Sequence, residues 1–404
     1  MKPLISILIA TKNRQKYCLS AVESILMLPN DNIEVVVQDN SDNTELEHLL
    51  KPFMSDSRLV YRYTPPPFSS IDNFNAAIEL ATGEYVCLIG DDDGINPQIV
   101  EATMWAKMNN VDCLVGNLKA NYRWENTGER QFLHLKITSS SLSLGNFNGA
   151  AKRVYSKQSI VKLIGNGCTN YLDFDFPKLY HGVVKKDVLD RLKTETGVYL
   201  KGLSPDIYAA IALAFKIDSF IVIDYPLTIP GVCSVSSSMQ EGEQKSNSKE
   251  LESAPHLRDR KTPYQWEINV PRIYCVQTIW ADSAFAAIKE FKQESLLNKF
   301  NKYVLCVNVL DADPTLESMI YAFLQSSEPN LTYKQLRNNM RKAKFKGVYM
   351  KRFVRILNRV KKVLGLDHYK SINSVMDIVS ATNQLQLLLK EINISLIDEL
   401  NQVK

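Results

Sequence analysis

Four short apolar runs alternate with amphipathic segments over the first 110 residues, and this alternation admits few folds. The runs are rich in β-branched residues, whereas the segments between them carry apolar side chains at helical spacing. Strands that are apolar throughout are typical of a mainly parallel sheet covered by helices. The predicted strands span 5–10, 33–38, 59–63 and 85–89, and the predicted helices span 15–28, a stretch ending near 54, 72–82 and 97–109.

Beyond residue 110 the pattern is less regular and ends in a helical region. Ser, Glu, Lys and Pro are frequent in 236–263, which predicts a mobile loop or linker. Helical spacing then continues nearly throughout 264–404. We therefore predict an α/β domain over 1–235, with halves at 1–110 and 111–235, followed by the linker and a mostly helical C-terminal region. The further predicted strands are 112–118, 179–184 and 219–224, and the further helices are 186–194 and 205–216.

The composition excludes several classes of protein. Hydrophobic residues make up 45% and charged residues 23% of the 404-residue chain, which argues against wholesale disorder. The longest apolar candidate, 207–215, is much shorter than the ~18 residues of a membrane span. No cleavage site follows the apolar stretch at 4–10, so we expect a cytoplasmic chain. The seven cysteines form no C-x-x-C pair, which argues against a disulfide framework or a zinc knuckle.

Three consecutive carboxylates, Asp91, Asp92 and Asp93, follow the apolar run at 85–89. Adjacent carboxylates repel one another, and a hard divalent cation bound to oxygen ligands and substrate phosphates removes that repulsion. The alternative is a helix N-terminus, where a negative charge is favourable, but one aspartate would serve that purpose. The triplet therefore predicts a site for Mn²⁺ or Mg²⁺ that bridges to a diphosphate.

Two other predicted strands also end in polar residues. Thr11, Asn13 and Arg14 follow the first strand, where they could contact a nucleotide or simply cap the next helix. Asp39 follows the second strand, where it could contact a base or ribose or act as a turn residue. Ligands of open α/β sheets bind beyond the carboxyl ends of the strands, so these residues are candidates for one site.

Together these stretches resemble the inverting family 2 glycosyltransferases of the GT-A fold. The matching motifs are 6–14, 35–41, 81–86 and 90–93, in the order and spacing of that family, and the resemblance covers about 235 residues. It implies an α/β GT-A fold with a Rossmann-like mixed sheet, in which 1–110 binds a nucleotide-sugar donor and 111–235 binds the acceptor.

The resemblance also assigns roles to individual residues. Asp39 is expected to contact uracil and Asp91 the ribose, while the metal falls on Asp92 with Asp93 beside it. Gly90 stands where the usual motif begins with an acidic residue. Asn75 matches a residue of the family's Arg-Asn pair before the third motif, so we expect it to contact the nucleotide. The arginine of that pair is absent, because Phe74 occupies its position.

An inverting transfer needs a general base near the acceptor hydroxyl. The resemblance places this base on Asp206, at the start of a predicted apolar helix, where the alternative is an ordinary N-terminal carboxylate. His181 is a weaker candidate for the acceptor rim, against a structural role. The stretch 231–234 resembles a flexible loop that closes over a diphosphate, or is a plain linker.

A concentration of positive charge marks the C-terminal region. Twelve of the 48 basic residues lie in 334–366, which contains no Asp or Glu. Within it, 348–366 separates into an apolar and a basic helical face, which is typical of a helix on an anionic membrane surface. Packing of the apolar face against the chain's own core is the alternative. Nucleic acid is not expected, because no recognised module is present. A second amphipathic helix within 372–404 would form a homodimer or pack internally.

We therefore predict a metal-dependent inverting glycosyltransferase. The donor is expected to be UDP-linked, and the acceptor a glycan or a polyprenyl-diphosphate-linked sugar in bacterial surface polysaccharide synthesis, at the cytoplasmic face of the membrane. One alternative is a degenerate domain that acts as a membrane-associated scaffold. The other is a sugar nucleotidyltransferase, although no Gly-rich phosphate loop follows the first strand.

Overall fold

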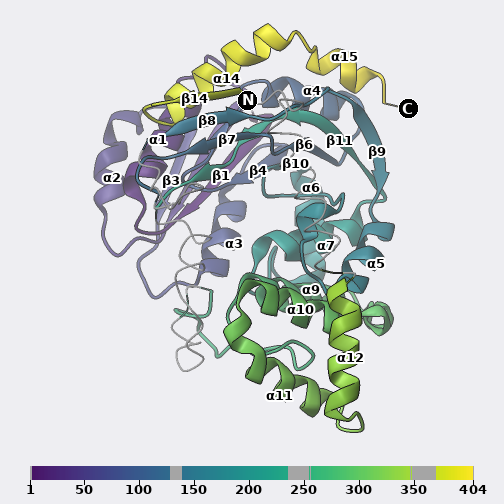
Figure 1. Cartoon of the computed structure of the whole chain (residues 1–404). Helices are drawn as coiled ribbons and strands as arrows, with labels where there is room; N and C mark the ends of the chain where they lie inside the picture. Colours follow the sequence, from purple (N-terminus) through teal and green to yellow (C-terminus); the bar gives the residue numbers. More distant parts are fainter. Residues whose placement is uncertain are drawn as a thin grey trace.

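The computed structural model describes residues 2–127, 139–234, 254, 256–345, 347 and 370–403. Its centre is a mixed sheet of eight strands in the order β3-β2-β1-β4-β10-β6-β11-β9 (Figure 1). This architecture, with a helical region after it, confirms the predicted fold class. The strands of the sheet are β1 (Ile5–Thr11), β2 (Ile33–Asp39), β3 (Leu59–Tyr63), β4 (Tyr85–Ile89), β6 (Cys113–Asn117), β9 (Ala151–Tyr155), β10 (Gly182–Lys185) and β11 (Ser219–Pro226).

The strands predicted in the first 110 residues form the parallel part of the sheet. β1 pairs in parallel with β2 and with β4, and β2 pairs in parallel with β3. β10 is antiparallel to both β4 and β6, so the strands on its two sides run in the same direction. The carboxyl ends of β1, β2 and β4 therefore lie together at one edge. The polar residues that follow these strands predicted this arrangement.

Helices cover both faces of this sheet, and each face has its own core. Side chains alternate along a strand, so Ile7 and Ile9 enter one core and Leu8 the other. This two-sided burial explains why β1 is apolar throughout. One face carries α1 (Gln15–Leu26), α2 (Glu45–Leu50) and α4 (Ile99–Met108); the other carries α3 (Ser70–Leu80), α5 (Lys157–Gly165), α6 (Lys186–Thr196) and α7 (Pro205–Lys216).

Several short strands were not predicted from the sequence. β5 (Gly94–Ile95) pairs with β12 (Thr228–Ile229), and a second sheet has the order β13-β7-β8-β14. β14 (Lys370–Asn373) lies in the region predicted to be almost all helical, and it pairs with β8 (Ser141–Leu144). The remaining members are β7 (Ala120–Arg123) and β13 (Gly231–Val232). Runs of two to four residues leave little periodicity, and their partners are far away in sequence.

The C-terminal region packs in two separate places. The helices α9 (Val276–Glu290), α10 (Lys302–Ala312), α11 (Glu317–Ser327) and α12 (Tyr333–Lys344) form a group below the sheet, where α9 contacts α7 (Figure 1). The helices α14 (Ile378–Ile392) and α15 (Leu396–Asn401) return to the first half and contact α1 and α4. Leu385, Leu389 and Leu396 are buried there. The apolar face of this segment therefore packs internally, which is one of the two predicted alternatives.

The basic segment is described only in part. Its first residues, 334–344, form nearly all of α12, whereas the amphipathic pattern at 348–366 lies outside the described residues. In the part of the chain that the structure describes, no helix has both the length and the apolarity needed to cross a bilayer.

Candidate active site

The ends of β1 and β4 meet because these strands are neighbours in the sheet. Thr11, the last residue of β1, donates through Oγ1 to Asp91 Oδ2 at 2.6 Å. Both residues are almost fully buried. The hydrogen bond places the first carboxylate of the acidic triplet directly beside the first strand.

Arg14 lies between two carboxylates of the triplet. Its guanidinium contacts Asp91 Oδ1 at 2.6 Å and Asp92 Oδ2 at 2.9 Å, and it also donates to Cys233 Sγ at 2.8 Å. Neither carboxylate oxygen receives a well-aligned hydrogen bond. Burial raises the pKa of Asp91 to about 7 against the opposing effect of Arg14, and burial with the charge of Asp93 raises the pKa of Asp92 to about 6. One arginine therefore compensates the acidic cluster incompletely.

Asp93 differs from its two neighbours because its oxygens are surrounded by donors. Oδ1 accepts from the backbone N–H of Gly231 at 2.6 Å, and Oδ2 accepts from Gly90 N–H at 2.5 Å and the Tyr180 hydroxyl at 3.1 Å. His181 Nε2 lies 3.4 Å from the same Oδ2. Asp93 thus connects the turn after β4 to β13. The sequence could not predict this contact, because the two segments are far apart along the chain.

His181 is buried within this cluster. Its backbone is left-handed, with φ at 60°, and its ring packs edge-on against Tyr180 at 4.4 Å. Burial and the charge of Lys178 lower its pKa to about 3, so the imidazole is neutral. The structure therefore places His181 against Asp93.

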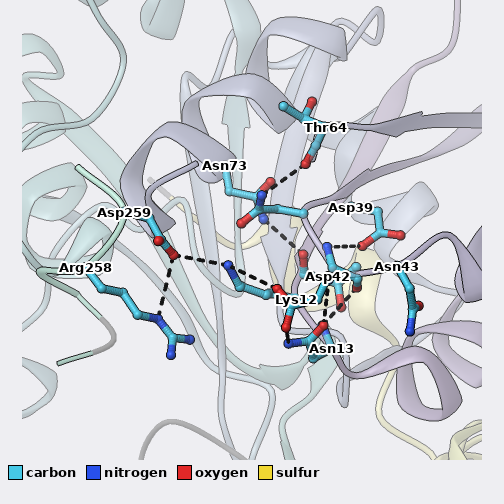
Figure 2. Close-up of polar contacts among 12 residues, drawn as sticks. Lys12, Asn13, Asp39, Asp42, Asn43, Thr64, Asn73, Arg258 and Asp259 are labelled. Carbon is cyan, nitrogen blue, oxygen red and sulfur yellow. Dashed lines mark hydrogen bonds and ion pairs between the residues drawn. The ribbon is translucent and has the colours of Figure 1, made fainter. Parts of the chain in front are cut away.

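Asp39 and Asn13 organise the loops that follow β1 and β2 (Figure 2). Asp39 is buried, with Oδ1 accepting from Ser41 N–H at 2.8 Å and Oδ2 from the Tyr61 hydroxyl at 2.9 Å. Asn13 exchanges two hydrogen bonds with Asp42, one in each direction, at 2.7 and 2.9 Å. Both expected nucleotide-binding residues therefore lie at the same edge as Thr11.

Two asparagines of α3 have different surroundings. Asn73 is buried and donates to the Thr11 carbonyl at 3.1 Å, while its Oδ1 accepts no hydrogen bond. The expected residue, Asn75, instead donates to the Leu200 carbonyl and accepts from the N–H groups of Tyr199 and Leu200. Residues two apart on a helix point in nearly opposite directions. A helical projection of 70–80 would have drawn attention to Asn73, which the motif comparison missed.

Asp206 lies in the first turn of α7, directly after Pro205. It has no hydrogen bond or ion-pair partner among the described residues, and it remains partly accessible. Burial and the nearby charge of Asp93 raise its pKa to about 6, against the opposing effect of Lys178. Burial raises the pKa of Tyr171 and of Tyr180, and the charge of Asp206 adds to both increases. The fold thus brings Asp206 close to the acidic triplet across 115 positions of sequence.

Two cavities lie elsewhere in the molecule. One, of about 620 Å³, is lined by residues of α4 and α14 and by Tyr225. The other, of about 640 Å³, is bordered by Gly202 and Arg260. Neither cavity is lined by Asp91, Asp92 or Asp93. Buried charged side chains with shifted pKa values indicate a functional site more strongly than cavity volume does.

Comparison with known proteins supports the family resemblance. Residues 6–154 match the family described as glycosyl transferase family 2. This span holds Thr11, Arg14, Asp39 and the acidic triplet, so the resemblance expected from the motifs is confirmed over it. Asp206 and the C-terminal helices lie beyond the match.

Curated relatives are similar over the same part of the chain. A putative colanic acid biosynthesis glycosyl transferase, WcaA of Escherichia coli, is 35% identical over 97 residues, which is 24% of this chain and 34% of that protein. An uncharacterized glycosyltransferase of Methanocaldococcus jannaschii is 29% identical over 114 residues, covering 28% and 39%. The glycosyltransferase GlyG of Streptococcus pneumoniae is 27% identical over 120 residues, covering 29% and 40%. The chain therefore spans two fifths or less of these relatives.

Solved structures show more distant likeness. TarS of S. aureus in complex with UDP has a TM-score of 0.39 and 18% identity, over 63% of this chain and 66% of that one. The mannosyltransferase PcManGT of Pyrobaculum calidifontis, in complex with GDP-Man and Mn²⁺, has a TM-score of 0.36 and 14% identity, over 87% and 88%.

Proposed function

We propose that this chain, with its family 2 match at residues 6–154, is a metal-dependent inverting glycosyltransferase that uses a UDP-linked sugar. The observation that carries the proposal is the buried cluster of Arg14, Asp91 and Asp92 at the strand ends. Asp39 ends β2, the neighbour of β1, and Asp206 is near enough to the cluster for the charge of Asp93 to act on it. A nucleotide, a cation and an acceptor hydroxyl could therefore share the site beyond the strand ends.

The residues present fit a divalent cation. Asp91 Oδ1 and Asp92 Oδ2 are buried and contact the Arg14 guanidinium, which a bound cation would replace, and burial raises the pKa of both carboxyl groups. No group of three or more His, Cys, Asp or Glu ligands is assembled in the described part of the chain. We therefore assign Mn²⁺ or Mg²⁺ to Asp92 and Asp91, with phosphate oxygens of the donor as further ligands. Bound there, the cation would neutralise charge on the departing diphosphate.

Asp93 is less suited to this role than the sequence suggested. Its oxygens accept hydrogen bonds from Gly231, Gly90 and Tyr180, so metal binding would have to break them. We propose that Asp93 holds the turn that presents Asp91 and Asp92. Its charge also contributes to the raised pKa of Asp206.

Asp206 is the proposed general base. A carboxylate with a pKa of about 6 is mostly ionised at neutral pH and is a stronger base than an exposed aspartate. Its position in the first turn of α7 favours the anion, and none of the described residues donates a hydrogen bond to its oxygens. Asp206 would take the proton from the acceptor hydroxyl as that oxygen attacks the anomeric carbon. Inversion follows if the nucleotide leaves from the opposite side.

We propose an acceptor that is a glycan or a polyprenyl-diphosphate-linked sugar of bacterial surface polysaccharide synthesis. Basic residues at the end of α12, Arg341, Lys342 and Lys344, belong to the positively charged segment 334–366 and would face an anionic membrane surface. Peripheral attachment at the cytoplasmic face would bring the active site to a lipid-linked acceptor.

A thermal-shift panel tests this function. UDP, GDP, dTDP and CMP would each be added with and without Mn²⁺. A ligand at ~100 times its dissociation constant that binds only the native state adds about 2.7 kcal/mol. We expect UDP to raise the melting temperature, and to do so only with Mn²⁺. No shift with any nucleotide would favour the scaffold. UTP is added to the panel to test the nucleotidyltransferase, which a shift with UTP but with no diphosphate would favour.

A further inference from the structure

Two of the cations near the acidic triplet are already paired with carboxylates. Arg14 contacts Asp91 and Asp92, and Lys12 Nζ lies 3.2 Å from Asp259 and 3.9 Å from Asp42. A nucleoside diphosphate would bring further negative charge to the same edge. Its phosphates therefore need a cation that no internal carboxylate holds firmly.

The segment 256–260 runs beside this edge and is anchored through Asp259 and Arg260. Arg260 donates to the Gly202 carbonyl at 2.9 Å and to the His256 carbonyl at 3.1 Å. The ion pair between Lys12 and Asp259 attaches the segment to the end of β1. The segment therefore connects two loops. One precedes α7, the helix that carries Asp206, and the other follows β1 and carries Arg14.

Asp259 is held between two cations (Figure 2). Lys12 lies on one side, and the guanidinium of Arg258 lies on the other, with Nε 3.9 Å from the same carboxylate oxygen. The backbone of Asp259 is left-handed, with φ at 61°, a conformation that costs energy in a residue other than glycine. The Lys12 contact thus helps to hold the segment in this conformation.

Arg258 is the least committed of these cations. Its side chain is 47% exposed, against 22% for Lys12 and 17% for Arg14. Among the described residues its ion-pair partner is Asp259, at a distance too long for a hydrogen bond. An exposed guanidinium beside the nucleotide edge can contact a phosphate in bidentate fashion.

We propose that Arg258 is a donor-binding residue that contacts the diphosphate. In the absence of the donor, Asp259 pairs with Lys12 and Arg258 and keeps both cations at this edge. This inference rests on the proposed nucleotide-sugar donor. The diphosphate repels Asp259 and attracts both cations, so Lys12 and Arg258 exchange one carboxylate for phosphate oxygens. The segment 256–260 thereby contributes to donor affinity from outside the family match.

Calorimetric binding of UDP, UMP and uridine, each with Mn²⁺, tests the assignment. Arg258→Gln should weaken UDP binding about tenfold, since a charge-assisted hydrogen bond to phosphate is lost. The effect should be smaller for UMP and absent for uridine. Asp259→Asn should strengthen UDP binding, because a competing negative charge is removed. Arg272→Gln is the control, since Arg272 is another exposed arginine of the described range 256–345, and this variant should bind all three ligands like the wild type.

The outcomes separate this inference from the function on which it rests. If the wild-type chain binds no nucleotide, the proposed function fails. If the wild type binds UDP and Arg258→Gln binds it equally well, the role of Arg258 is overturned. Equal weakening for UDP and uridine would also overturn it, because a phosphate ligand cannot affect a nucleoside without phosphates. Melting temperatures of the variants show that each one is folded.

Discussion

Thr11 and Asp91 are joined by a 2.6 Å hydrogen bond between side chains that are 80 positions apart in sequence. The bond exists because β1 and β4 are parallel neighbours that end at the same edge of the sheet. It fixes one oxygen of Asp91 and leaves the other toward Arg14. The geometry of the proposed cation site therefore depends on a hydroxyl group of the first strand.

Replacing Thr11 with valine should remove this hydrogen bond at nearly constant shape. We expect a loss of about 1.5–3 kcal/mol in the free energy of unfolding, the range for a hydrogen bond to a charged group. Thr228→Val is a matched control, because the Thr228 hydroxyl is buried in a strand without a hydrogen-bond partner among the described residues. Urea unfolding measures both. Equal stability changes in the two variants would contradict the importance of the Thr11 contact.

Arg14→Met should destabilise the protein by about 3 kcal/mol, since removing one partner leaves buried charge uncompensated. If Asp91 and Asp92 bind the cation, Mn²⁺ should restore much of this loss in the variant. The exposed Arg153→Met serves as control, with a change below about 0.5 kcal/mol. Thermal unfolding with Mn²⁺ or EDTA measures the effect, and a metal-independent loss would argue against a cation at these carboxylates.

Asp206→Asn should bind UDP as tightly as the wild type and transfer sugar at least about 100-fold more slowly, which is the low end for general-base catalysis. The base must be ionised, so the wild-type rate should rise with pH through about 6 and level off above it. Asp187→Asn, at the same position of the first turn of α6, controls for helix-terminal charge. A pH–rate profile without this rise, or an active Asp206→Asn variant, would exclude Asp206 as the base.

Asn75→Ala should lower stability by about 2 kcal/mol, because two backbone N–H groups of the loop before α7 lose their acceptor. From the geometry we expect UDP affinity to change less than stability does. Urea unfolding and calorimetric UDP binding of this variant distinguish a structural role of Asn75 from a nucleotide-binding role. A tenfold loss of UDP affinity without loss of stability would instead support the role assigned by the motif comparison.

Leu385→Ala should destabilise the chain by about 2–5 kcal/mol, since the side chain is fully buried against the first half of the molecule. Leu387, on the same helix, is 54% exposed, so Leu387→Ala should be nearly neutral. Sedimentation of both variants tests the alternative of a dimer. If α14 formed a dimer through its buried face, Leu385→Ala would change the oligomeric state before it changed monomer stability.

Local chemistry made much of the first half predictable. The strands β1, β2 and β4 are largely apolar, are buried on both faces and are followed by polar residues, so their existence and shared edge followed from composition and alternation. The acidic triplet was identified in the same way, because three adjacent carboxylates require compensation wherever they lie. β14 could not be predicted, since four residues become a strand only when Ser141–Leu144 supplies the hydrogen-bond partner.

The order of the residues thus determined which side chains were chemically available, and the tertiary structure decided which of them meet. Periodicity placed Arg14, the aspartates and Asp206 at the ends of particular elements. Only packing showed that Arg14 lies between Asp91 and Asp92, that Asp93 is held by backbone donors, and that Asp259 reaches Lys12 across 247 positions. Hydrophobic patterns are local along the chain, whereas a charge finds its partner through the burial of elements distant in sequence.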